Sequence, residues 1–234
     1  NIPSIDVIYF MEHLNLPFTG PTSLLYDPPK DLMKYVAYTA GIKTPAFTLI
    51  ESIENIEKET AHLQYPLFVK PDKAGDSLGI DDCSLVQNKE ELTVKCTSII
   101  EEYGPLLVEE YIEGREFTVM LVANADDEKT CTIFKPIEYI FPKDFHVKTY
   151  ALKTSELHPE ANIPCTDPAL EASLKTAAYQ IFRGFGGVGY ARLDFRVNAK
   201  GEIFFLEINF TCSVFYKDGY EGSADYILKN DGIG

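Results

Sequence analysis

The sequence predicts an α/β protein. Three observations support this prediction: helical and strand patterns alternate in the first half, strand patterns dominate from residue 113, and a hairpin follows the last long helix. The 234 residues are enough for one large domain or two small ones.

The first half of the chain alternates between the two kinds of element. A short strand is expected at 17–20, ahead of a Pro-rich connector. Residues 30–40 predict a helix, because apolar residues recur along it, Pro28 and Pro29 precede it and Gly41 ends it. Beyond it, apolar runs predict strands at 46–51, 66–70, 83–86 and 105–112 and a helix at 88–104.

The second half is mostly β. Strand patterns occupy 115–123 and 131–140, and a long loop that includes 146–165 follows them. A helix at 168–186 then precedes a hairpin whose strands are 191–195 and 204–210.

Composition excludes several classes of function. The net charge of −15 argues against a nucleic-acid partner, which would require an excess of Lys and Arg. No apolar run approaches about 18 residues, so no membrane helix is expected, and the first residues lack a signal-peptide pattern. The five cysteines show no metal-like spacing and predict free thiols in a reducing compartment, the cytoplasm. Among them, Cys212 is expected to line a cleft without a chemical role.

The terminal hairpin carries the strongest chemical signal. If its turn centres on Lys200–Gly201, Asp194 lies opposite Glu207, and Arg192 lies opposite Asn209. Two carboxylates opposed at roughly 5 Å repel and call for a cation, and their oxygens are ligands that Mg²⁺ accepts. The alternative is a solvated hairpin face without a function.

Two further segments are candidates for a nucleotide site. Lys70 ends an apolar strand just before the glycine-containing loop 71–80, where a lysine can bind phosphate; a plain surface turn is the alternative. The strand at 105–112 breaks at Gly114, so its free backbone groups could pair with a purine edge and Glu116 with ribose hydroxyls. A bulged crossover with solvated acids is the alternative there.

Together these segments resemble the ATP-grasp carboxylate–amine ligases, and most closely the D-alanine–D-alanine ligases. The resemblance rests on separated motifs in the family's order: FTGPTSLLYDPPKDLMKYVAYTAGIKTP, PLFVKPDKAGDSLGI, LLVEEYIEGREFTV and YARLDF…GEIFFLEIN. It implies an ATP-grasp fold, in which two α+β subdomains hold ATP between them. The implied divisions are a tail of an N-terminal domain and a connector at 1–29, a central subdomain at 30–112 and a C-terminal subdomain at 113–234.

The resemblance also implies roles for individual residues. Phosphate lysines are implied at Lys30, Lys70 and Lys153, with Lys148 as a rival for the last, and Ser77 falls in the phosphate-covering loop. Adenine contacts are implied at Glu109 and Ile112, a ribose-binding acid at Glu116, and ligands for two Mg²⁺ ions, or Mn²⁺, at Asp194, Glu207 and Asn209. Arg192 matches the arginine that steadies the acyl phosphate and the tetrahedral intermediate.

Two departures from the family bear on the substrate. Ser213 stands where the family has a glycine whose backbone N–H helps to bind the intermediate, and Ser223 is the one serine of the segment that should grip the second amino acid. We therefore expect D-alanine to be a poor acceptor. The resemblance also implies an N-terminal domain that completes the first-substrate site and through which a homodimer could form, and residues 1–29 are expected to supply only its tail.

The implied function is ATP- and Mg²⁺-dependent ligation of a carboxylate to an amine, an amino acid or dipeptide, through an acyl phosphate. A non-catalytic ATP-binding module is the alternative from another class. An ATP-grasp kinase or carboxylate–thiol ligase also stays open, because nucleotide-binding residues do not report the acceptor.

Overall fold

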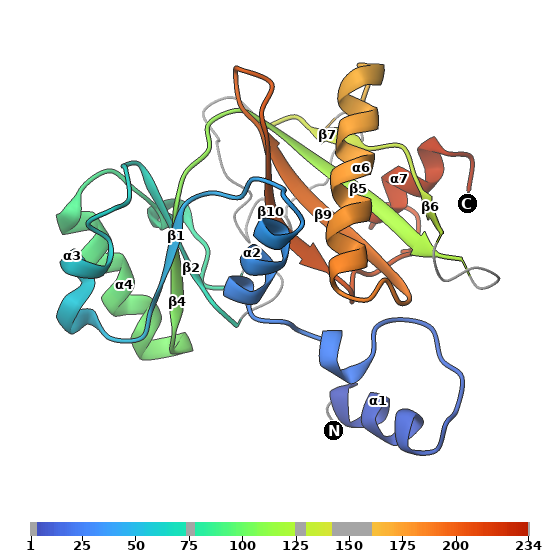
Figure 1. Cartoon of the computed structure of the whole chain (residues 1–234), viewed down its shortest axis with the longest axis horizontal. Helices are drawn as coiled ribbons and strands as arrows, with labels where there is room; N and C mark the ends of the chain where they lie inside the picture. Colours follow the sequence, from blue (N-terminus) through green and yellow to red (C-terminus); the bar gives the residue numbers. More distant parts are fainter. Residues whose placement is uncertain (1–3, 74–77, 125–129, 142–160, 234) are drawn as a thin grey trace.

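A computed structural model of the chain describes residues 4–73, 78–124, 130–141 and 161–233. Two antiparallel sheets form the frame, a four-stranded sheet of order β1-β4-β2-β3 and a six-stranded sheet of order β10-β9-β5-β7-β8, with β6 paired to β5 (Figure 1). The expected mixed α/β architecture is confirmed.

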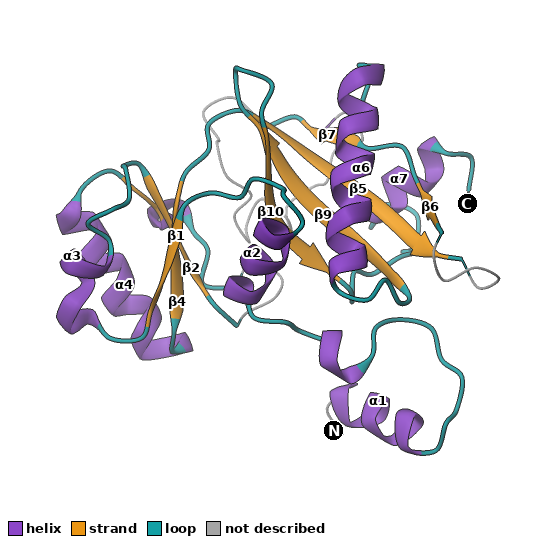
Figure 2. Cartoon of the chain, in the orientation of Figure 1, coloured by secondary structure: helices purple, strands orange, loops and turns teal. Residues whose placement is uncertain are grey.

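The four-stranded sheet comes from the first half of the chain. Its strands are β1 (Phe47–Ile50), β2 (Leu67–Pro71), β3 (Leu85–Val86) and β4 (Leu106–Glu110), and α3 (Ile56–Glu59) and α4 (Lys89–Tyr103) lie on its outer side (Figure 2). Alternation along the strands separates two faces. Leu67 and Val69 enter the core beneath the helices, whereas Lys70 and Glu109 are in the pocket described below.

The six-stranded sheet carries helices on both faces. Its strands are β5 (Arg115–Ala123), β6 (Cys131–Ile133), β7 (Ile137–Tyr139), β8 (Asn162–Pro164), β9 (Tyr190–Val197) and β10 (Ile203–Asn209). Helix α6 (Pro168–Gly184) covers one face and forms the largest core with it. Helix α7 (Ser223–Asn230) packs a smaller core on the opposite face.

Helix α2 (Lys30–Thr39) lies between the two sheets (Figure 1). Met33 and Ala37 enter the core shared by α6, β9 and β10. The helix also contacts the smaller sheet, where Tyr35 packs against Phe47 with ring centroids 5.5 Å apart. The predicted division at residue 30 stays a prediction.

Helix α1 (Ser4–His13) projects from the rest of the chain and has no buried residue. It contacts the short helix η1 (Ser23–Leu25), where Glu12 accepts hydrogen bonds from the backbone N–H and hydroxyl of Ser23 at 2.8 and 2.6 Å. The strand expected at 17–20 is wrong: these residues form the loop between α1 and η1. Within the described part of the chain, no helix is both long and apolar enough to cross a membrane.

Candidate functional site

A pocket lies where the two sheets meet. Six of the site residues expected from the sequence line it: Lys70, Glu109, Ile112, Glu116, Asp194 and Glu207. The rest of its wall consists of Pro45, Phe68, Ile80, Glu110, Tyr111, Arg196 and Leu206. Segments separated by more than a hundred residues therefore meet where the resemblance placed a nucleotide.

The terminal hairpin brings its acids to this pocket through a β-bulge. Asp194 pairs with Glu207, as the sequence predicts, but nearer the turn Phe195 pairs with Phe205, so Leu206 is an extra residue in β10. Because of this extra residue, Phe205 and Glu207 point to opposite faces of the sheet, although residues two apart in a regular strand share a face. Phe205 enters the core with Phe195, whereas Glu207 lines the pocket two residues later.

The predicted metal ligands have defined partners. Asp194 accepts hydrogen bonds from the Thr118 hydroxyl at 2.8 Å and from Nη2 of Arg192 at 3.1 Å. Asn209 pairs with Arg192 across the strands, and its Oδ1 accepts from the Thr211 backbone N–H at 2.8 Å. The opposed Asp194 and Glu207 carboxylates fit Mg²⁺, which commonly takes one or two protein carboxylates together with waters and phosphates.

No group of three or more His, Cys, Asp or Glu side chains among the described residues forms a metal cage. A metal at this hairpin would therefore depend on the amide of Asn209 or on oxygens from a substrate. Arg192 beside Asp194 is half-buried; burial disfavours its charge, but nearby negative groups, Asp194 first among them, outweigh that effect and raise its pKa.

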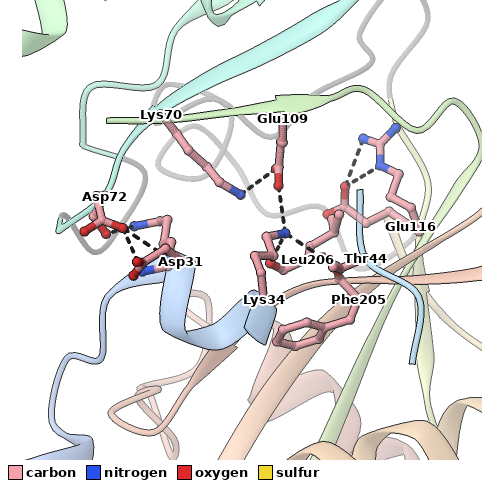
Figure 3. Close-up of polar contacts among 11 residues, drawn as sticks. Asp31, Lys34, Thr44, Lys70, Asp72, Glu109, Glu116, Phe205 and Leu206 are labelled. Carbon is pink, nitrogen blue, oxygen red and sulfur yellow. Dashed lines mark hydrogen bonds and ion pairs between the residues drawn. The ribbon is translucent and has the colours of Figure 1, made fainter. Parts of the chain in front are cut away.

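A buried charge cluster occupies the other side of the pocket (Figure 3). Glu109 Oε1 lies 2.6 Å from Nζ of Lys70, and Glu109 Oε2 lies 2.7 Å from Nζ of Lys34. Lys34 also donates to the backbone carbonyl of Leu206 at 2.8 Å, a carbonyl that the bulge presents to it. Lys34 thus connects the smaller sheet to the larger one.

Burial controls the protonation of this cluster. It lowers the pKa of the fully buried Lys34 ammonium to about 8, against the opposing pull of Glu109. Burial also raises the pKa of Glu109, but Lys34 and Lys70 outweigh it and hold that pKa below its ordinary value. The carboxylate of Glu109 is thus bound by two lysines, and its implied contact with adenine stays a prediction.

Lys34 was not identified from the sequence. A signal was present, because Lys30 and Lys34 are four residues apart on a predicted helix and share one face. Lys30 opens α2: its backbone N–H donates to Asp72 Oδ1 at 3.0 Å and its Nζ to the Asp72 carbonyl at 3.3 Å. Burial lowers the pKa of Lys30, and Glu207 partly opposes that effect.

Glu116, the expected ribose acid, is bound by an arginine that sequence reasoning also missed. Nε and Nη2 of Arg196 lie 3.2 and 3.0 Å from Glu116 Oε2. Gly114 makes the nearby crossover possible: at φ +148° its Cα passes so close to β9 that an added Cβ would lie 2.1 Å from the Val197 carbonyl oxygen.

Cys212 and Ser213 are not among the residues that line the pocket. Ser213 is exposed after β10, and Cys212 is buried, which raises the pKa of its thiol to about 11. Ser77, Lys148 and Lys153 lie outside the described residues, so their roles stay predictions.

Comparison with known proteins identifies a family. The profile described as D-ala D-ala ligase C-terminus matches residues 36–214. The D-alanine–D-alanine ligase of Aquifex aeolicus is 30% identical over 201 residues, which are 85% of this chain and 64% of that protein.

Solved structures agree with this result. The VanG D-Ala:D-Ser ligase from Enterococcus faecalis superposes with a TM-score of 0.75 and 25% identity, over 97% of this chain and 64% of that one. The D-alanine–D-alanine ligase from Bacillus anthracis complexed with ATP gives a TM-score of 0.68 at 22% identity, over 87% of this chain and 62% of that one. The chain spans less than two thirds of each of these three relatives, and the fold is that of the ATP-grasp ligases.

Proposed function

Because the chain belongs to the family of D-alanine–D-alanine ligase C-terminal domains, we propose that it binds Mg-ATP in the pocket between its sheets and serves in ADP-forming ligation of a carboxylate to an amine. The observation that carries the proposal is the pairing of Asp194 with Glu207 at the wall of a pocket whose other wall holds Lys70. This arrangement offers oxygen ligands for a cation and an ammonium for phosphate on facing walls.

In the proposed reaction, the protein stabilises charge on the phosphates and on the reacting carboxylate, and no side chain forms a covalent bond to the substrate. A carboxylate is a poor electrophile, and phosphorylation by ATP would convert it to an acyl phosphate that an amine can attack. Bound at Asp194, Glu207 and Asn209, Mg²⁺ (two ions, or Mn²⁺) would supply positive charge to the phosphates. Lys70 and Lys30 would orient the phosphates, and Arg192, held by Asp194, would stabilise the charge that develops on the reacting centre.

The proposed substrates are amino acids or dipeptides. Relatives are named for D-alanine and for D-Ala with D-Ser, so the carboxylate substrate is proposed to be of the amino-acid class. We propose that D-alanine is a poor acceptor amine, because Ser213 is expected at the family's glycine position and Ser223 alone represents the expected serine-rich segment.

The setting is proposed to be the cytoplasm. All five cysteines are free in the structure, as expected for a reducing compartment. Assembly as a homodimer stays a prediction from the resemblance.

Nucleotide binding is tested by thermal melting with millimolar ATP, with and without Mg²⁺. A ligand that binds the folded state raises the melting temperature, and at a hundred times its Kd it adds about 2.7 kcal/mol. An increase that requires Mg²⁺ supports the proposal, and unchanged melting contradicts it.

Ligation is tested by phosphate release across a panel of amino acids and dipeptides, in a protein that includes any segment the family places before residue 1. Release that depends on an amino acid supports the ligase. Binding of Mg-ATP without release on any acceptor favours the alternative, a non-catalytic ATP-binding module.

A further inference from the structure

Arg196 is a pocket residue that several side chains and a backbone carbonyl hold in place. It lies on β9, is 4% exposed and lines the pocket. Two of its nitrogens donate to Oε2 of Glu116, which pairs with it across β5 and β9. Its third nitrogen, Nη1, donates to the Tyr111 hydroxyl at 2.6 Å and to the Ile112 carbonyl at 3.3 Å.

Aromatic rings hold the same guanidinium. Its central carbon lies 4.9 Å from the centroid of the Tyr111 ring and 5.2 Å from that of Phe141. The Phe141 ring is itself packed against Tyr139, with centroids 4.9 Å apart. Cation–π contacts strengthen when they are buried, so these rings fix the plane of the guanidinium as well as its position.

These contacts join the two sheets at one end of the pocket. Arg196 and Glu116 belong to the larger sheet, whereas Tyr111 and Ile112 directly follow β4 of the smaller one. Arg196 therefore fixes two groups at once: the carboxylate expected to bind ribose, and the backbone expected to meet the base.

We propose that Arg196 is a positioning residue that determines how strongly the site selects for ribose hydroxyls. The inference rests on the proposed function, because it assumes that the nucleotide binds in this pocket. A carboxylate that is buried and held by two donors keeps one orientation, so it accepts hydrogen bonds from hydroxyls without first being reorganised. Without Arg196, Glu116 would lose the two donors that fix its orientation, and its carboxylate could turn away from the ribose.

The test is equilibrium binding of Mg-ATP and Mg-2′,3′-dideoxy-ATP by calorimetry, with the chain as it stands. We expect wild type to bind ATP at least tenfold more tightly than the dideoxy nucleotide. Arg196→Met should bind ATP at least tenfold more weakly and reduce the ratio of the two affinities to about one. Arg196→Lys should give an intermediate ratio, because an ammonium keeps the charge but lacks the planar fork.

Arg115→Met is the matched control. Arg115 forms an equivalent pair with Glu138, with Nε–Oε1 and Nη2–Oε2 distances of 2.8 and 2.6 Å, and it lies over the Phe117 ring at 4.8 Å. It is not among the residues that line the pocket, so this variant should keep both affinities within twofold of wild type.

The outcomes separate this inference from the function on which it rests. If Arg196→Met leaves the ratio of the two affinities unchanged, even with both nucleotides bound more weakly, the inference about Arg196 is overturned. The proposed nucleotide site would still stand. Failure of wild type to bind ATP would overturn the proposed function and the inference with it. If Arg196→Met does not fold, Arg196→Lys decides, because an unchanged ratio in that variant refutes a role for the guanidinium.

Discussion

The buried cluster of Glu109 and two lysines predicts an unusual pattern of stability. Replacing Glu109 by Gln keeps the size of the side chain but leaves Lys34 and Lys70 as buried cations without their shared anion. Losing one partner of a buried ion pair typically costs about 3–5 kcal/mol of unfolding free energy. The cluster therefore allows the contribution of a buried charge to the unfolding free energy to be measured directly.

The protonation of Lys34 limits this cost. The pKa of Lys34 is already about 8, so removing its proton at pH 7 costs about 1.4 kcal/mol of unfolding free energy. Loss of Glu109 can cost no more than this at Lys34, because the ammonium then gives up its proton. The weakened hydrogen bonding of Lys70 adds about 1–3 kcal/mol. Together these effects predict a loss of about 3 kcal/mol, at the lower end of the general range, or about 6–12 °C in melting temperature for a chain of this size.

The assay is urea unfolding at pH 7, followed by circular dichroism. Adding Lys34→Met to Glu109→Gln should restore about 1 kcal/mol, because it removes one of the two uncompensated buried groups. The matched control is Glu202→Gln, which breaks the exposed pair with Lys43 and should cost less than about 1 kcal/mol. The reasoning is refuted if Glu109→Gln is as stable as the control, or if the double variant is less stable than Glu109→Gln alone.

Three other predictions concern protonation and chemistry. The folded pKa of Lys34, about 8, lies below the value near 10.4 of an unfolded lysine, so its charge opposes folding below pH 8 and this cost fades as pH rises to about 10. Wild type should therefore gain up to about 3 kcal/mol of unfolding free energy relative to Lys34→Met over that interval; a constant difference contradicts the shift. Glu207→Gln should keep the melting temperature but abolish phosphate release in an active protein, and release at the wild-type rate would show that Glu207 is no metal ligand. Cys212→Ala should keep phosphate release within about tenfold, since burial raises the pKa of the thiol to about 11 and keeps it protonated; complete loss with ATP binding intact would indicate covalent catalysis.

The sequence predicts the acids of the hairpin well because strand alternation is local. A turn at Lys200–Gly201 and a period of two predicted the opposition of Asp194 to Glu207, but the pairs nearer the turn are shifted by one residue and the bulge at Leu206 restores the predicted register. The predicted helices and strands that begin and end with clear signals were found near their expected bounds. Helix α4, for example, starts after Asn88, whose side chain accepts from the Glu91 N–H, and ends at Gly104.

What the sequence did not predict depends on contacts between distant segments. No sequence pattern singled out Arg196, which the fold places beside Tyr111. None singled out Lys34 as a buried residue either, and it is buried because α2 lies between the two sheets. Neither partner lies near in sequence, so neither pairing has a local pattern that could reveal it.

The extra residue in β10 separates two demands that usually compete within one strand. Leu206 adds one residue between Phe205 and Glu207, so the first enters the core and the second lines the pocket although they are two positions apart. If β10 paired regularly with Leu206 retained, Phe205 and Glu207 would lie on the same face, and one of them would leave its place. At this point of the chain, the register of the backbone determines whether the carboxylate reaches the cleft.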